Sequence, residues 1–328
     1  MIFHPSIFMF IISLCVSIIM IIGSNSWFMA WLGLEINLLS FIPLMLNKNK
    51  YSSESALKYF LIQALASTVI LASAILGLIW LPIFSPMLLL LALLLKVGAA
   101  PFHQWLPATV EGLSWSPVFI LLTAQKLAPL MLISYMFMEH HLNMILNLFI
   151  IISALTGSLG GLSLPSLRKI LSFSSIAHMG WILASIKFSN FLWLIYFMMY
   201  SLILYSVIHT FYSGQLNKLS HLTSTQSITQ SLMSTLPLLS LGGLPPFSGF
   251  LPKFLVMSKL ISFSDTFIFM VLLISTLISL FFYMRVAIST FFISRSILSN
   301  KKKIDLNLSS LILNLIGLLA PSILFILM

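Results

Sequence analysis

KVGAAPFHQWLP, residues 96–107, places a lysine, a glycine and two prolines inside an otherwise apolar run. Proline removes a backbone hydrogen bond from a helix, and lipid offers no replacement for it. The segment PFHQWLP at 101–107 reappears as PFSGFLP at 246–252, an offset of 145 residues (246 − 101). Paired interruptions of apolar spans point to a transport site near the middle of the membrane. Two ordinary proline kinks are the alternative, and the lysines beside both interruptions argue against it.

Composition places the chain in a membrane. Of its 328 residues, 60% are hydrophobic and 7% are charged, with a mean hydropathy of +1.12, whereas soluble domains average about 25% charged residues. The net charge of +10 comes without a dense basic patch interleaved with aromatic residues, so a nucleic-acid partner is not expected. One cysteine, Cys15, cannot supply the four thiolates of an iron–sulfur cluster. We therefore predict an all-α membrane protein forming a single transmembrane domain over residues 1–328.

Apolar runs of roughly 20 residues, the length that spans a bilayer, divide the chain into about eleven predicted transmembrane helices. They cover residues 2–22, 26–46, 56–80, 87–105, 115–137, 143–163, 168–186, 190–212, 228–258, 266–292 and 306–327. The offset of 145 maps the first five onto the next five. Because five is odd, the second copy must be inverted in the membrane. This predicts one five-helix repeat over 1–137, an inverted one over 142–292, each with a broken helix, and a C-terminal helix over 306–328.

Lysine and arginine are distributed unevenly among the predicted loops. Even-numbered loops hold Lys48, Lys50, Arg168, Lys169, Lys218, Arg295, Lys301, Lys302 and Lys303, whereas loops seven and nine hold Lys187 and Lys259. Positive residues favour the inner compartment. The N-terminus is therefore predicted on the inner side and the C-terminus on the opposite side.

Three ionisable residues of the first repeat are candidate proton-transfer groups. Lys96 and Lys126 lie near the middle of consecutive predicted spans, where a lysine costs about 2.5 to 3.5 kcal/mol on insertion scales. Each therefore needs a hydrated pocket or a counter-charge. Glu35, within GLEINLLSFIP (33–43), is the acidic residue predicted deep in the membrane. It is either a functional partner of Lys96 or half of a static ion pair that locks two helices.

The second repeat supplies two further candidates. His178 lies near the centre of its span, within SLRKILSFSSIAHMGW (166–181). Histidine titrates near neutral pH, so it either relays protons or hydrogen-bonds a serine across helices. Lys253 directly follows the second interruption, but the offset of 145 maps it onto Ala108, so it matches Lys96 only loosely.

Other polar residues give weaker signals. Lys58 lies near a helix end and Arg285 in the last third of its helix, so both rank below the other buried charges. His103 and His209 could bind metal or haem, but nothing places facing histidines at one depth. No phosphate-binding loop, catalytic carboxylate pair or Ser/His/Asp arrangement is visible. We predict no cofactor and no metal in this chain.

Several motifs together resemble one family. KVGAAPFHQWLP, QKLAP (125–129), ALKYFLIQALAS (56–67), SLRKILSFSSIAHMGW and LLSLGGLPPFSGFLPKF (238–254) resemble, in order, the antiporter-like membrane subunits of respiratory complex I, and among them the mitochondrial NADH dehydrogenase subunit 2 family. The match runs from about residue 25 to 290, and the last forty residues fit only by hydropathy.

The resemblance implies a core membrane-arm subunit of an H⁺-translocating NADH:ubiquinone reductase in the mitochondrial inner membrane. Its N-terminus would face the matrix and its C-terminus the intermembrane space. Subunits 4 and 4L, accessory subunits and lipids would be neighbours, and no redox centre would lie in this chain. Glu35 and Lys96 would form a charge pair, Lys126 the central relay, Lys253 the exit-side group, and His178 part of the hydrophilic axis. A stand-alone cation/proton antiporter and a non-pumping structural subunit are the alternatives.

Overall fold

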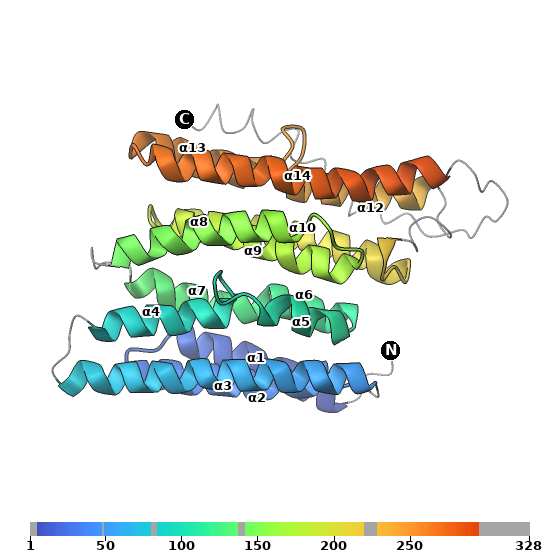
Figure 1. The fold of residues 1–328 in the computed structure, drawn as a ribbon. Coiled ribbons are helices and arrows are strands. Elements are labelled where there is room, and N and C mark those ends of the chain that lie inside the picture. Colours follow the sequence, from blue (N-terminus) through green and yellow to red (C-terminus); the bar gives the residue numbers. More distant parts are fainter. Residues whose placement is uncertain (1–4, 48, 80–83, 137–141, 220–227, 295–328) are drawn as a thin grey trace. The chain divides into compact units, whose positions relative to one another are not determined.

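The computed structural model describes residues 5–47, 49–79, 84–136, 142–219 and 228–294 (Figure 1). These residues form α-helices, and the β-type pairing described among them is a single isolated bridge between Ser166 and Lys218. The predicted all-α fold is therefore confirmed. The chain divides into two compact units, Met1–Phe149 and Ile150–Met328. The predicted inverted duplication is not tested by this division and stays a prediction.

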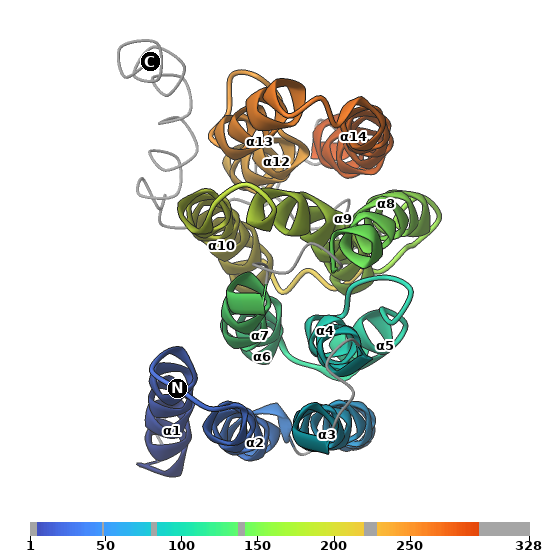
Figure 2. The ribbon, with the colours of Figure 1, turned by 90° about the vertical axis from the view of Figure 1, so that its left-hand side faces the viewer.

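The first unit is built from helices that lie side by side in two layers (Figure 2). Its helices are α1 (Pro5–Ile22), α2 (Trp27–Met45), α3 (Lys50–Ile79), α4 (Phe84–Val97), α5 (Trp105–Gly112), α6 (Trp115–Leu122) and α7 (Ala124–Met136). Within one layer, α2 packs between α1 and α3. In the other layer, α4 packs on α7, and α3 contacts both α4 and α5.

The second unit is arranged around one buried helix, which spans Leu167–Ile186. Helix α8 (Leu142–Gly160) contains the division between the units, and the helices after it are α9 (Leu167–Ile186), α10 (Asn190–Ser213), α12 (Ile228–Gly242), α13 (Phe250–Ser262) and α14 (Thr266–Ser294). Helix α9 contacts α10, α13 and α14, while α12 packs between α10 and α14. Two loops meet at one end of this unit, where the Leu167 amide donates to the Asn217 carbonyl at 3.1 Å.

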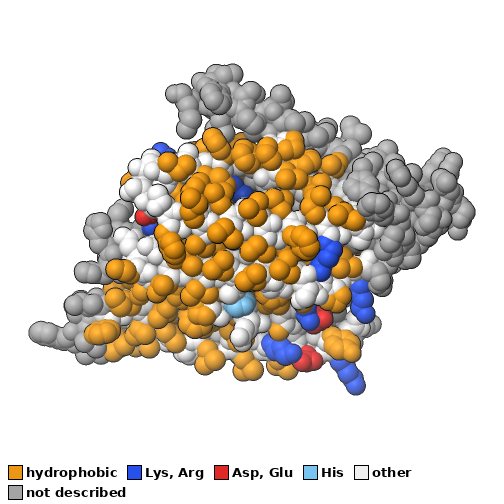
Figure 3. All heavy atoms as spheres, turned by 45° about the horizontal axis from the view of Figure 1, so that its top comes forward, with side chains coloured by type: hydrophobic (Ala, Val, Ile, Leu, Met, Phe, Trp, Pro, Cys, Tyr) orange, Lys and Arg blue, Asp and Glu red, His pale blue; other side chains and the backbone are white. Residues whose placement is uncertain are grey.

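Seven described segments are long and apolar enough to cross a membrane. They are Trp27–Met45, Lys50–Gly77, Trp115–Met136, Leu142–Gly160, Leu167–Ile186, Asn190–Ser213 and Thr266–Ser289. Helices α1 and α4 are shorter apolar helices. The predicted span 306–327 lies outside the described residues, so the number eleven stays a prediction. Apolar side chains cover most of the face in Figure 3, and most charged side chains in view gather near its edges.

Four predicted helix extents were wrong. The span predicted at 228–258 is divided into α12, which ends at Gly242, and α13, which runs on to Ser262. The span predicted at 56–80 begins at Lys50, because the polar residues before position 56 continue the helix. The span predicted at 87–105 ends at Val97 and resumes as α5, which runs on to Gly112. The span predicted as continuous over 115–137 is interrupted at Thr123, with φ −119° and ψ −83°. Unlike glycine and proline, threonine does not by itself break a helix.

Helix α9 shows how burial and polarity are matched. It is the least apolar of the seven spans, yet 89% of it is buried, whereas 33% of the most apolar span, in α14, is buried. Polar groups in lipid must find partners inside the protein. The least apolar of the spans is therefore the one most fully enclosed by its neighbours.

Glycine allows α8 and α9 to approach closely. A Cβ at Gly157 would overlap the backbone of Ala177, and one at Gly160 would overlap the Phe173 ring. A Cβ at Gly180 would contact the Ile150 carbonyl oxygen at 3.1 Å. These contacts run antiparallel along the two helices, and small residues are the usual means of such close packing in membranes.

We expect Gly157→Ala to lower the free energy of unfolding by about 1 to 3 kcal/mol, because the methyl group must push two helix backbones apart. Thermal unfolding of the purified protein in lipid nanodiscs measures this loss. Gly23→Ala is the matched control, since a Cβ there meets its nearest neighbour, the Ile19 carbonyl oxygen, at 3.6 Å. Equal melting temperatures for the two variants would contradict the close packing.

Candidate functional site

The two predicted interruptions are both built around a glycine in the left-handed backbone region. Gly98 has φ +77° and follows the last residue of α4, and Gly243 has φ +79° and follows the last residue of α12. Such a residue commonly ends a helix, and glycine adopts this conformation without steric cost. Their separation, 145 residues (243 − 98), equals the offset of the sequence repeat. Each interruption leaves helix carbonyl groups that need partners within the protein.

Lys96 lies in the last turn of α4, beside the first interruption, and is 6% exposed. Side chains from two neighbouring helices bind the carbonyl groups there: Gln63 Nε2 donates to the Lys96 carbonyl at 3.2 Å, and Trp105 Nε1 donates to the Leu95 carbonyl at 3.2 Å. A cation in the last turn also faces the negative end of the helix dipole. Lys96 therefore lies at the end of a half-helix rather than at the middle of a continuous span.

Lys253 occupies the other side of the second interruption, in the first turn of α13, and is 4% exposed. Its ammonium group reaches back to α12 and donates to the Gly242 carbonyl at 2.8 Å and to the Leu241 carbonyl at 3.3 Å. A Cβ at Gly243 would lie 2.9 Å from the Lys253 Nζ. Glycine at this position thus provides both the turn and the room for the lysine.

Lys126 lies in the first turn of α7, just after the interruption at Thr123, and is 2% exposed. Its backbone amide donates to the Thr123 carbonyl at 3.0 Å. The first turn is the positive end of a helix dipole. Lys126 therefore lies at the opposite kind of helix end from Lys96. This could not be predicted from the sequence, because threonine also occurs within continuous helices.

Glu35 lies on α2 and is partly exposed. Its carboxylate acts electrostatically on Lys96, but these two described side chains do not form a direct ion pair. Of the five predicted residues, Glu35, Lys96 and Lys126 lie in the first unit, and His178 and Lys253 lie in the second. The assignment of proton transfer to this set stays a prediction.

A neutral polar link joins the helices that carry Glu35 and Lys126. Tyr59 on α3 donates its hydroxyl proton to Gln125 Oε1 at 3.0 Å, and Gln125 Nε2 donates to Asn37 Oδ1 at 2.9 Å. Asn37 is two residues from Glu35, and Gln125 precedes Lys126. These three residues were missed in the sequence, although polar side chains within the apolar motifs GLEINLLSFIP, ALKYFLIQALAS and QKLAP were a usable signal.

His178 lies on α9 among buried hydroxyl groups. Its Nδ1 is 3.0 Å from the Tyr196 hydroxyl, and the Tyr200 ring centroid lies 5.1 Å from the imidazole centroid. Ser174 and Ser175, on the same helix, are fully buried. The tyrosines were also missed, because their rings follow the apolar pattern of their helices.

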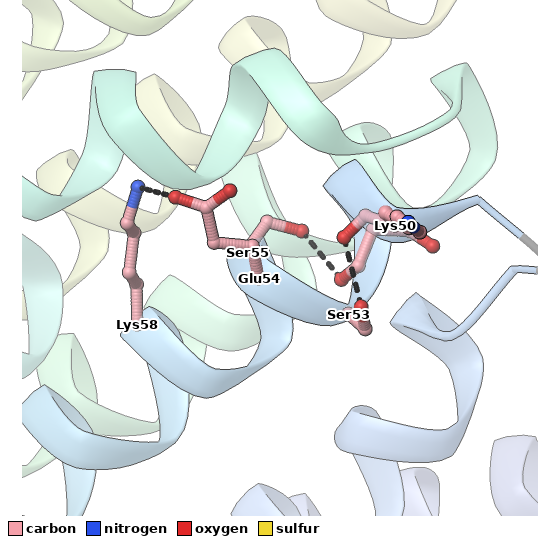
Figure 4. Close-up of polar contacts among 6 residues, drawn as sticks. Lys50, Ser53, Glu54, Ser55 and Lys58 are labelled. Atoms are coloured by element: carbon pink, nitrogen blue, oxygen red, sulfur yellow. Dashed lines mark hydrogen bonds and ion pairs between the residues drawn. The ribbon is translucent and has the colours of Figure 1, made fainter.

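The weaker sequence candidates have other surroundings. Lys58 forms an exposed ion pair with Glu54 one turn away, at 2.6 Å (Figure 4). Arg285 donates to the carbonyl groups of Leu162 and Leu164, just after α8 ends. His209 lies beside the Tyr205 ring. No group of three or more His, Cys, Asp or Glu side chains that could hold a metal occurs in the described part of the chain.

Comparison with known proteins identifies the family. The model of the NADH:quinone oxidoreductase/Mrp antiporter transmembrane family matches residues 24–279. The chain belongs to this family. It is 46% identical to NADH-ubiquinone oxidoreductase chain 2 of Anopheles gambiae, over 97% of this chain and 98% of that one. The protein of the same description from Bos taurus is 36% identical, over 88% and 86% of the two chains. The resemblance seen in the sequence motifs is confirmed.

Solved structures show that the family fold is shared. A chain of respiratory complex I from Thermus thermophilus matches with a TM-score of 0.84 and 21% identity, covering 98% of this chain and 80% of that one. A chain of the Mrp complex from Dietzia sp. matches with a TM-score of 0.79 and 16% identity, covering 91% and 62%. The antiporter-like fold implied by the sequence resemblance is therefore confirmed.

The polar link makes a stability prediction. Gln125→Leu leaves the buried Tyr59 hydroxyl without its acceptor, which we expect to lower the free energy of unfolding by about 1 to 3 kcal/mol. Adding Tyr59→Phe removes the stranded hydroxyl, so the double variant should recover part of this loss. Thermal unfolding of the wild type, the two single variants and the double variant completes the cycle. Strictly additive losses would show that the two side chains are not energetically coupled.

Proposed function

We propose that this chain is a core membrane-arm subunit of mitochondrial respiratory complex I and contributes to proton translocation coupled to NADH:ubiquinone electron transfer. One observation carries the proposal. Three lysines, Lys96, Lys126 and Lys253, are at most 6% exposed, and each lies within one helical turn of an interruption in a predicted membrane span. Ionisable groups in such positions are costly and mark ion pathways.

In the proposed mechanism, protons pass among groups whose charges influence one another. A positive charge on Lys96 is favoured while Glu35 is ionised, and becomes less favourable once Glu35 is protonated or moves away. The carbonyl ends of α4 and α12 stabilise the cationic forms of Lys96 and Lys253. Redox energy released in other subunits would shift charge along Glu35, Lys96, Lys126, His178 and Lys253, each step changing the proton affinity of the next group.

The setting of the chain is part of the proposal. The curated relatives named above are NADH-ubiquinone oxidoreductase chains, and this supports other complex I membrane-arm subunits as partners, with subunits 4 and 4L as expected neighbours. The excess of lysine and arginine in even-numbered loops supports an N-terminus in the matrix and a C-terminus in the intermembrane space. The redox centres would lie in other subunits.

Lys126→Met tests the proposal. The change keeps a long apolar side chain and removes the charge, so we expect the complex to assemble but to pump fewer protons per NADH oxidised. The measurement is the ratio of protons translocated to NADH oxidised in complexes reconstituted into vesicles, after native gels have verified assembly. Lys58→Met is the matched control, because Lys58 is exposed and paired with Glu54, and it should leave the ratio unchanged.

The alternatives give different results in the same experiments. An unchanged ratio in assembled Lys126→Met complexes would exclude this lysine from the proton path and favour a structural subunit. A stand-alone cation/proton antiporter would carry ions when this chain alone is placed in vesicles. Absence of such flux, together with a lowered ratio in the complex, supports the proposed function.

A further inference from the structure

Trp31 and Glu35 lie four residues apart on α2, so their side chains are neighbours on one face of this helix. Both residues are partly exposed, but the Trp31 Nε1 atom is itself buried and has no hydrogen-bond partner among the residues that the structure describes. The Phe28 ring lies beside the indole, with the two centroids 5.9 Å apart. A buried hydrogen-bond donor thus lies about one helical turn from a carboxylate.

A buried N–H group without an acceptor costs free energy, because burial removes its hydrogen bonds to water. The indole nitrogen of tryptophan can only donate, and a buried indole usually binds an acceptor. Because atoms of this chain cover Nε1, a lipid headgroup or another subunit cannot reach it. We therefore expect the acceptor for Trp31 to lie inside this chain.

The carboxylate of Glu35 is within reach of the indole. Helix α2 contains one acidic residue, and it is Glu35. A helical side chain lies over the turn that precedes its own Cα atom, so Glu35 leans toward Trp31. Their Cβ atoms are separated by about 5 to 6 Å, a gap that rotation of the two side chains can close without movement of the backbone. The resulting charge-assisted hydrogen bond is about twice as strong as a neutral one.

Direct contact with Lys96 does not hold the Glu35 carboxylate in place, since these two described side chains form no direct ion pair. A turn of the carboxylate toward Trp31 would move its negative charge toward the preceding turn of α2. The Coulomb interaction between two charges weakens as their distance grows. A donor at Trp31 would also favour the ionised form of Glu35.

We propose that Trp31 is a positioning residue for Glu35, whose indole N–H holds the carboxylate in a second position, turned toward Trp31. In this position Glu35 stays ionised and acts less strongly on Lys96. The inference rests on the proposed function and assigns a residue that controls the first charge pair of that pathway. Movement between the two positions changes the electrostatic surroundings of Lys96 while Glu35 gains no proton.

Trp31→Phe in the assembled complex tests the proposal, because it keeps an aromatic ring and removes the N–H group. The measurement is the ratio of protons translocated to NADH oxidised, taken over a range of pH. Without the donor, the ionised form of Glu35 loses a hydrogen bond. We therefore expect the acid side of the pH profile to move to higher pH, by up to about one pH unit.

Trp27→Phe is the matched control. The change and the helix are the same, and Trp27 is also partly exposed, but it lies about two turns from Glu35. Its pH profile should coincide with that of the wild type. The melting temperature of each complex is measured in parallel, so that a loss of packing can be distinguished from a loss of positioning.

The outcomes separate this inference from the proposed function. If Lys126→Met lowers the ratio and assembled Trp31→Phe complexes keep the wild-type pH profile, Trp31 does not position Glu35 while the proposed function stands. If Lys126→Met leaves the ratio unchanged, the proposed function fails and this inference fails with it. An equal shift in Trp27→Phe, or a lower melting temperature with an unchanged profile, also overturns the inference.

A second measurement decides the question if Trp31→Phe does not assemble. Infrared spectra of wild-type and Glu35→Gln complexes compare the indole N–H vibration at neutral pH. A band of a strongly hydrogen-bonded indole that is lost in Glu35→Gln supports the proposal. Identical indole bands in the two complexes overturn it, because Trp31 would then donate to another acceptor or to none.

Discussion

The hydrocarbon core of a membrane offers no hydrogen-bond partner, and the structure depends on meeting this constraint at every helix interruption. At the first interruption, Gln63 and Trp105 bind the carbonyl groups that the end of α4 leaves open. At the second, Lys253 itself binds the last carbonyl groups of α12. At the second interruption, the lysine and the carbonyl groups that it binds therefore each lower the free-energy cost of burying the other.

The same constraint explains where polar side chains are found. In the first unit, the link Tyr59–Gln125–Asn37 joins three helices at the level of the ionisable residues. In the second unit, His178 of α9 lies against Tyr196 and Tyr200 of α10. In each unit, buried polar side chains thus gather where other polar groups can bind them, around Gln125 in the first unit and around His178 in the second.

The sequence predicted what depends on residue type, and failed where the result depends on packing. Glycine and proline within apolar runs predicted the interruptions at Gly98 and Gly243, and the motifs around them predicted the family. The break at Thr123 could not be predicted, because threonine is common in continuous helices and only its surroundings fix its unusual backbone angles. The tyrosines beside His178 also could not be predicted, since an aromatic ring at helical spacing is typical of an apolar core. The roles of Glu35, Lys96, Lys126, His178 and Lys253 stay predictions.

The hydrogen bonds of Arg285 determine which amino-acid substitutions the loop after α8 can tolerate. Its guanidinium group donates to the carbonyl groups of residues 161, 162 and 164, and so it binds the loop after α8 through backbone atoms alone. Since every amino acid presents the same carbonyl group, the side chains of Leu162 and Leu164 can vary without loss of these bonds. The arginine cannot, because lysine lacks the planar fork of donors that reaches several oxygens at once. One contact therefore makes the loop side chains replaceable and the distant arginine hard to replace.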